Sequence, residues 1–168
     1  MAGGLSGCGA VTGREYLAPE KERQDIRSAA VLPLENLTST RDIGKIVADE
    51  LATELAARKI SVIDRGRSEA SLDRIDVVAG GSIDRLAAQR LGEVLGVDAV
   101  VYGSVEEAGD GHAEDGPHHA DVGIMVRVLD VRTGGYLLAG SYTACAAGDS
   151  LTSAAQRAAD RVARAVGR

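Results

Sequence analysis

The chain has 168 residues, no Phe and no Trp, and a formal net charge of −6. This length suits one domain whose core is filled by Val, Leu, Ile and Ala without help from disulfides or metals. The acidic balance argues against a nucleic-acid partner, which needs a basic surface, and no run approaches the roughly 20 apolar residues of a transmembrane helix.

The first motif along the chain is Leu5-Ser6-Gly7-Cys8, which resembles the lipobox of bacterial lipoproteins. In that family the signal peptide is cut before the cysteine, and the cysteine then carries lipid, so the resemblance implies a covalent lipid such as palmitate on Cys8. Small residues before the cut let the backbone enter a protease cleft. Only residues 1–4 precede the motif, so we expect the rest of the leader to lie upstream. The alternative is a disordered tail with an accidental cysteine.

A polar stretch of mixed charge follows the motif up to Arg27. It predicts a flexible tether, which would span about 60 Å if fully stretched. We therefore divide the chain into a lipobox remnant and tether, residues 1–27, and a folded domain, residues 28–168.

The domain begins with a strand, a helix and a second strand. Residues 29–32 form an apolar run that Pro33 ends, which favours a buried strand. Apolar residues at steps of four within 39–59 predict an amphipathic helix, and residues 60–64 predict the second strand. This order implies a right-handed parallel crossover.

The second half continues with a weak helical segment at 67–75 and a clearer helix from about 83 to 95, which Ser82 can cap. Strands are expected at 98–107, at 121–131 with strict apolar alternation, and at 136–143; a helix from about 149 to 166 ends the chain. The pattern predicts an α/β fold: a mixed sheet of about five strands, with two parallel crossover units and then an antiparallel hairpin, flanked by helices.

Four segments, AVLPLENLT, ADELATELAARKISVIDR, RLGEVLGVDAVVYGSV and VRVLDVRTGGYLLAGSYT, resemble in order and spacing the CsgG-like and TolB-N-terminal-like periplasmic domains. The match covers about residues 29–143. It implies an outer-membrane-anchored periplasmic lipoprotein that acts as a non-enzymatic scaffold or assembly factor of a surface or envelope machine. The alternative is a lipoprotein regulator that docks on a penicillin-binding protein. Gly9 stands where the inner-membrane retention signal of lipoproteins is usually an aspartate, which implies the outer membrane. Whether the chain forms a homo-oligomer stays open.

One relative in that family is the curli secretion channel, in which each subunit contributes membrane-spanning hairpins. Here the corresponding segment, residues 107–120, is short and rich in His, Asp, Glu and Gly. Lipid would leave its charges and backbone groups unsatisfied. We expect that the protein is not itself a pore.

The sequence contains no recognisable catalytic motif. Gly7, Gly9 and Gly13 miss the spacing of a dinucleotide-binding loop, and Gly44-Lys45 lacks the rest of a phosphate-binding loop. We expect no enzymatic activity and no cofactor besides the lipid.

Two further groups of side chains are candidate sites. His112, His118 and His119 are residue types that ligate metals, but the glycine-rich segment around them favours a solvated connection over a metal site. The last helix carries an arginine row that is either a solvated face or an interaction face for anionic lipid, cell-wall polymer or an acidic neighbouring subunit: Arg157, Arg161, Arg164 and Arg168.

Overall fold

The computed structural model describes residues 11–63, 65–72, 83–111, 119–147 and 150–167. Seven strands form one mixed sheet in the order β1-β7-β6-β5-β2-β4, with the short β3 beside β5. The strands are β1 (Val11–Leu17), β2 (Ser28–Val31), β3 (Glu35–Asn36), β4 (Ser61–Ile63), β5 (Ala99–Gly111), β6 (His119–Asp130) and β7 (Tyr136–Ala147). The helices are α1 (Glu20–Gln24), α2 (Ile43–Ala57), α3 (Arg65–Leu72), α4 (Arg85–Leu95) and α5 (Leu151–Val166). The predicted α/β class is confirmed, with two strands more than expected.

Both predicted parallel units are present, since β2 pairs in parallel with β4 on one side and with β5 on the other. The apolar run of β2 is continuous because both of its faces are buried. Ala29 and Val31 join the core beneath α2, whereas Ala30 and Leu32 join the smaller core that also contains Leu91 of α4.

The second half of the sheet is an antiparallel meander of β5, β6 and β7. The alternating residues predicted for one face of β6, such as Val122 and Val126, are fully buried. The solvated connection expected between the predicted strands at 98–107 and 121–131 is shorter than predicted at both ends, because β5 continues to Gly111 and β6 already begins at His119. Backbone pairing extends this hairpin even where the side chains are polar, since an antiparallel sheet can face water on one side.

The predicted flexible tether is also corrected by the structure. Its residues 11–17 form β1, which pairs antiparallel to β7 from Val11 opposite Ala144 to Leu17 opposite Leu138. Residues 20–24 then form the short helix α1. An edge strand needs only one paired side and one half-buried face, so its sequence can be largely polar. The folded domain therefore includes residues well before the predicted boundary at 28.

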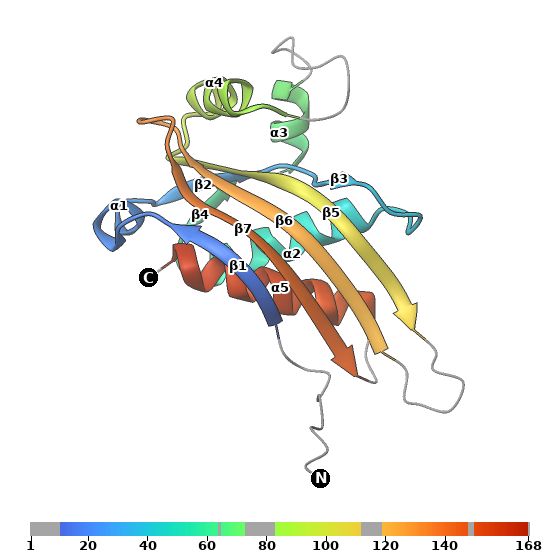
Figure 1. Cartoon of the computed structure of the whole chain (residues 1–168). Coiled ribbons are helices and arrows are strands. Elements are labelled where there is room, and N and C mark those ends of the chain that lie inside the picture. The colour runs from blue at the N-terminus through green and yellow to red at the C-terminus, as the bar shows by residue number, and fades with distance from the viewer. Residues whose placement is uncertain (1–10, 64, 73–82, 112–118, 148–149, 168) are drawn as a thin grey trace.

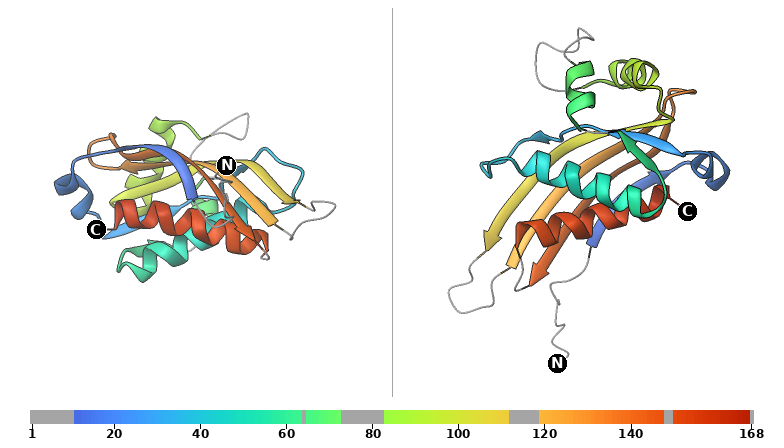
Figure 2. Two further views of the ribbon diagram at one scale, coloured as in Figure 1. Left: turned by 60° about the horizontal axis from the view of Figure 1, so that its bottom comes forward. Right: turned by 180° about the vertical axis from the view of Figure 1, so that it is seen from behind.

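The helices divide between the two faces of the sheet. Figures 1 and 2 show α2 and α5 side by side along one face, while α3 and α4 gather at one end of the other. The helix α5 approaches the sheet closely because its buried side consists mostly of small residues: Ala154, Ala155, Ala158, Ala159 and Val162. The two terminal strands of the sheet are β1, which lies beside α5, and β4, which lies beside α2.

Candidate functional site

Cys8, the predicted lipid-attachment residue, lies outside the described residues. The structure nevertheless bears on it, because β1 starts at Val11. Only Gly9 and Ala10 separate the cysteine from the sheet, so a lipid on Cys8 is joined to the folded domain by three residue steps, or about 10 Å of extended chain. The anchor would hold the domain much closer to a membrane than the predicted tether.

The chain's second cysteine is Cys145. It lies within β7 opposite Asp121, is half-buried, and is disulfide-bonded in the structure. The chain has two cysteines in all. Because a thioether sulfur cannot join a disulfide, a lipidated Cys8 is no disulfide partner, and the two modifications can be told apart by experiment.

The arginine row of α5 is partly engaged inside the molecule. An Nη2–Oε1 distance of 2.6 Å joins Arg161 to Glu15 of β1, and Arg164 Nε lies 2.8 Å from Asp160 Oδ2. Arg157 is exposed on the same helix, and Arg168 lies outside the described residues. Part of the row thus stabilises the contact between α5 and β1.

Glu15 is the centre of this contact, because it also accepts a hydrogen bond of 2.5 Å from the hydroxyl of Tyr142. Burial and the Glu15 carboxylate both raise the pKa of Tyr142. Tyr102 and Tyr136, on the other face, have their hydroxyl oxygens 3.3 Å apart. Each of these three hydroxyls therefore has a partner inside the protein.

A second ionic cluster connects α2 with α5. Arg58, which follows α2, bonds to Asp160 at 2.6 Å and to Glu54 at 2.8 Å. Burial works against the ionised form of Asp160, but hydrogen bonds from Arg164 and Arg58 outweigh it and lower the pKa of that carboxyl. This cluster has a structural role, since it fixes the two helices to each other.

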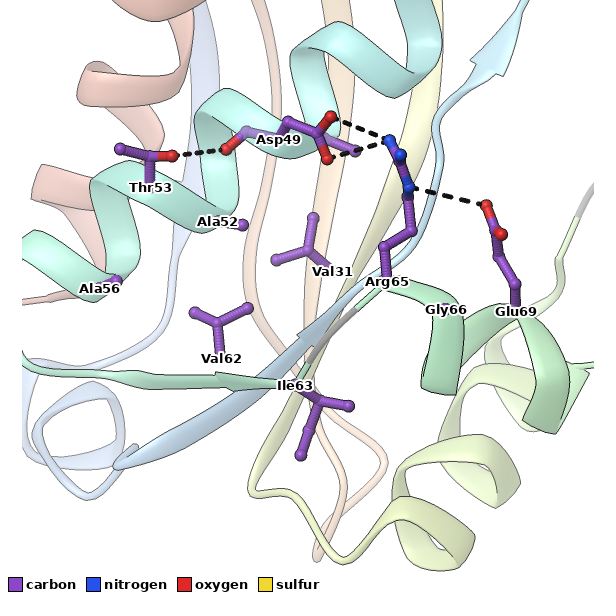
Figure 3. Close-up of a pocket in the computed structure, with 11 residues that line it drawn as sticks. Val31, Asp49, Ala52, Thr53, Ala56, Val62, Ile63, Arg65, Gly66 and Glu69 are labelled. Carbon is purple, nitrogen blue, oxygen red and sulfur yellow. Dashed lines mark hydrogen bonds and ion pairs between the residues drawn. The ribbon is translucent and has the colours of Figure 1, made fainter.

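At the opposite edge of the sheet, a groove of about 560 Å³ opens between α2, β4 and the start of α3. Its floor is formed by small apolar side chains that include Ala52, Ala56 and Val62. Figure 3 shows three charged residues along its rim, where Arg65 lies between Asp49 of α2 and Glu69 of α3. The groove is thus lined by both apolar and charged side chains.

The rim charges are partnered but remain accessible. Arg65 Nη1 donates to both carboxylate oxygens of Asp49, at 3.0 and 2.9 Å, and its Nε lies 3.9 Å from Glu69. The side chains of Asp49 and Glu69 are 60% and 46% exposed. One arginine offsets two carboxylates, so the rim keeps a net negative charge. No sequence motif identified these residues.

The predicted histidine cluster is only partly visible. His112 and His118 lie outside the described residues; His119 begins β6, with its Nε2 3.5 Å from Asp121 Oδ2. Within the described part of the chain, no group of three or more His, Cys, Asp or Glu side chains is placed to hold a metal ion. Nor, among those residues, is any helix long and apolar enough to cross a membrane.

The fold belongs to a class with solved representatives: a mixed sheet with two long helices on one face. One is the PelC dodecamer from Paraburkholderia phytofirmans, at 21% identity and a TM-score of 0.68, covering 94% of this chain and 98% of that one. Another is lipoprotein GNA1162 from Neisseria meningitidis, at 22% identity and a TM-score of 0.53, covering 70% of this chain and 78% of that one. LpoB from Escherichia coli matches at 14% identity and a TM-score of 0.51, over 72% of this chain and 59% of that one.

No protein-family model matches the chain, and no curated protein matches it. At the identities above, the structural likeness shows the fold alone. The finer resemblance to CsgG-like and TolB-like domains stays a prediction.

Proposed function

We propose that this chain is a periplasmic lipoprotein, anchored to the outer membrane through Cys8, that acts as a homo-oligomeric, non-enzymatic scaffold or assembly factor of an envelope machine. The observation that carries the proposal is the nearly complete structural match to PelC, a chain that forms a dodecamer. The likeness to GNA1162, which is a lipoprotein, supports the anchor.

The alternative, a regulator that docks on a penicillin-binding protein, draws support from the likeness to LpoB. Two observations favour the scaffold. This chain covers 98% of the PelC chain but 59% of the LpoB chain. In addition, a regulator that reaches across the cell wall from the outer membrane needs a long linker, whereas β1 starts three positions after Cys8.

A non-enzymatic role is supported by how the ionisable side chains are used. In the described part of the chain, Glu15, Asp160 and Asp49 each bind an arginine that belongs to a different element. These pairs join strands and helices to one another, as structural ion pairs do. We propose no cofactor besides the lipid.

The anchor is tested by metabolic labelling with a fatty acid, after the chain is expressed behind a lipoprotein signal peptide. We expect label in the protein and recovery of the protein with the outer membrane. Cys8→Ala should abolish both, and Cys145→Ser is the matched control because it removes the other thiol without touching the lipobox. A protein that stays unlabelled and shows a shifted mobility without reductant would instead carry the Cys8 sulfur in a disulfide, and the proposed anchor would be wrong.

The scaffold and the regulator are separated by crosslinking in cells. A scaffold should yield crosslinked multiples of the chain itself. Specific capture of a penicillin-binding protein, without multiples of the chain, would support the alternative.

A further inference from the structure

We propose that copies of this chain assemble head to tail, with the β1 edge of one copy docked on the β4 edge and adjoining groove of the next. This inference rests on the homo-oligomer in the proposed function and specifies its interface. The β4 edge with its adjoining groove, here called the groove edge, is thus occupied by a second copy of the chain.

The first argument is the position of the two open edges. In the sheet order β1-β7-β6-β5-β2-β4, the strands β1 and β4 are terminal, and each pairs with one neighbour in the described structure. A terminal strand presents backbone N–H and C=O groups that can pair with another chain. Because the two edges lie at opposite ends of one sheet, the molecule can use both at once.

The second argument is that the two edges differ in charge. The β1 edge carries the exposed Arg14 and, beside β1 on α5, the exposed Arg161. Glu15 offsets one of these charges, which leaves the edge basic. The groove edge carries Asp49 and Glu69 against Arg65. Opposite charges favour contact between unlike edges and disfavour contact between two copies of the same edge.

The third argument is apolar surface. The groove beside β4 has a floor of small apolar side chains that is open to solvent. On β1, Tyr16 is 56% exposed although it is a large aromatic residue. Docking of the two edges would remove apolar surface from water on both copies, which is the main driving force of association.

Together these observations define a heterologous interface, in which two different patches meet. Each docked copy keeps one edge open for the next, so assembly continues until the rotation between copies closes a ring. A symmetric dimer would instead bury the same edge on both copies and leave the groove empty.

The interface is tested on the full lipidated chain with a photocrosslinking amino acid placed at position 14 or at position 61, followed by mass-spectrometric mapping of the joined peptides. From position 14 we expect intermolecular links to the segment that contains Asp49, Val62 and Glu69. From position 61 we expect links to residues 11–17. Links from position 14 to position 14 of another copy would show a symmetric contact and overturn the proposal.

A charge reversal provides an independent measurement, namely the native mass of the purified protein. Arg14→Glu should shift the protein from oligomer toward monomer, whereas Arg14→Lys should keep the oligomer. Arg132→Glu is the matched control, because Arg132 is 79% exposed in the turn after β6, on neither edge. Unchanged circular dichroism confirms that the variants fold.

The outcomes separate this inference from the proposed function. An oligomer that survives Arg14→Glu and shows crosslinks elsewhere would overturn the interface and leave the scaffold standing. A lipidated wild-type protein that is monomeric at all concentrations would overturn both the interface and the homo-oligomer, while the anchor would stand on its labelling result.

Discussion

The hydroxyl of Tyr142 donates a 2.5 Å hydrogen bond to Glu15, across 127 residues of sequence. The same carboxylate binds Arg161, so one partly buried acid joins β1, β7 and α5. This relationship makes β1 part of the folded domain rather than a tether, and it helps to hold Val11–Leu17 on the sheet.

Tyr142→Phe should lower the free energy of unfolding by about 1.5–3 kcal/mol, because it removes a hydrogen bond to a charged, largely buried group. Chemical denaturation of the purified protein measures this change. Tyr16→Phe, on the exposed side of β1, is the control and should change the value by less than about 0.5 kcal/mol. Equal losses in both variants would show that the Glu15 contact does not stabilise the domain.

Val126→Asp should prevent folding or cost several kcal/mol, since it places an unpaired charge at a fully buried position of β6. Its neighbour Arg127 points to the other face of the sheet and is half-buried. Arg127→Asp should therefore be mild. Circular dichroism and thermal melting compare the two variants, and similar damage from both would contradict the observed orientation of this strand.

The hydrogen bonds of Asp98 predict that the protein loses stability at acid pH. Its carboxylate accepts hydrogen bonds from the Arg27 N–H at 3.0 Å and from the N–H and hydroxyl of Ser28, both at 2.9 Å. Partial burial opposes ionisation, but these bonds outweigh it and lower the pKa of Asp98. The stabilisation is thus complete above the unfolded-state value of about 3.9 and is lost as the pH falls through the lower folded-state pKa.

Accordingly, Asp98→Asn should destabilise the protein by about 1 kcal/mol at neutral pH, because the site is exposed and a neutral amide accepts more weakly. The difference from the wild type should shrink as the pH is lowered below about 3.9. Denaturant titrations at several pH values measure it. A difference that does not change with pH would mean that the carboxylate charge is not the cause.

Gly44→Ala should destabilise the protein although alanine favours helices. A Cβ at this position would lie 2.0 Å from the carbonyl oxygen of Leu34, a backbone atom that cannot simply rotate away. The first turn of α2 would have to shift, at a cost of about 1–3 kcal/mol. Gly109→Ala is the control, because no atom lies within 4 Å of its added Cβ. Thermal melting should show a loss for the first variant and little change for the second.

The proposal that this protein is not itself a pore predicts no discrete channels when the purified lipidated protein is added to planar bilayers. The strand β5 carries two exposed charges, Glu106 and Glu107, which lipid would leave unsatisfied. Stable conductance steps that vanish when residues 107–120 are deleted would overturn this expectation.

The elements whose side chains repeat with a clear period could be predicted from the amino-acid sequence alone. Residues of β2, α2, β6 and α5 were predictable because burial on one or both faces leaves an apolar pattern in the local sequence. The absence of Phe and Trp likewise implied a core of Val, Leu, Ile and Ala, and the structure has such a core.

The two edges of the sheet and their neighbours could not be predicted in this way, because they depend on contacts between elements that are far apart in the sequence. The strand β1 is held by backbone pairing to β7 and by the contacts of Glu15, whose side-chain partners lie more than 120 residues away. The local sequence therefore does not predict this strand. The groove likewise needs α2, β4 and α3 to be brought together, and its rim carboxylates share a single arginine. Periodicity records which face of an element is buried, whereas these contacts depend on which distant element the fold places beside it.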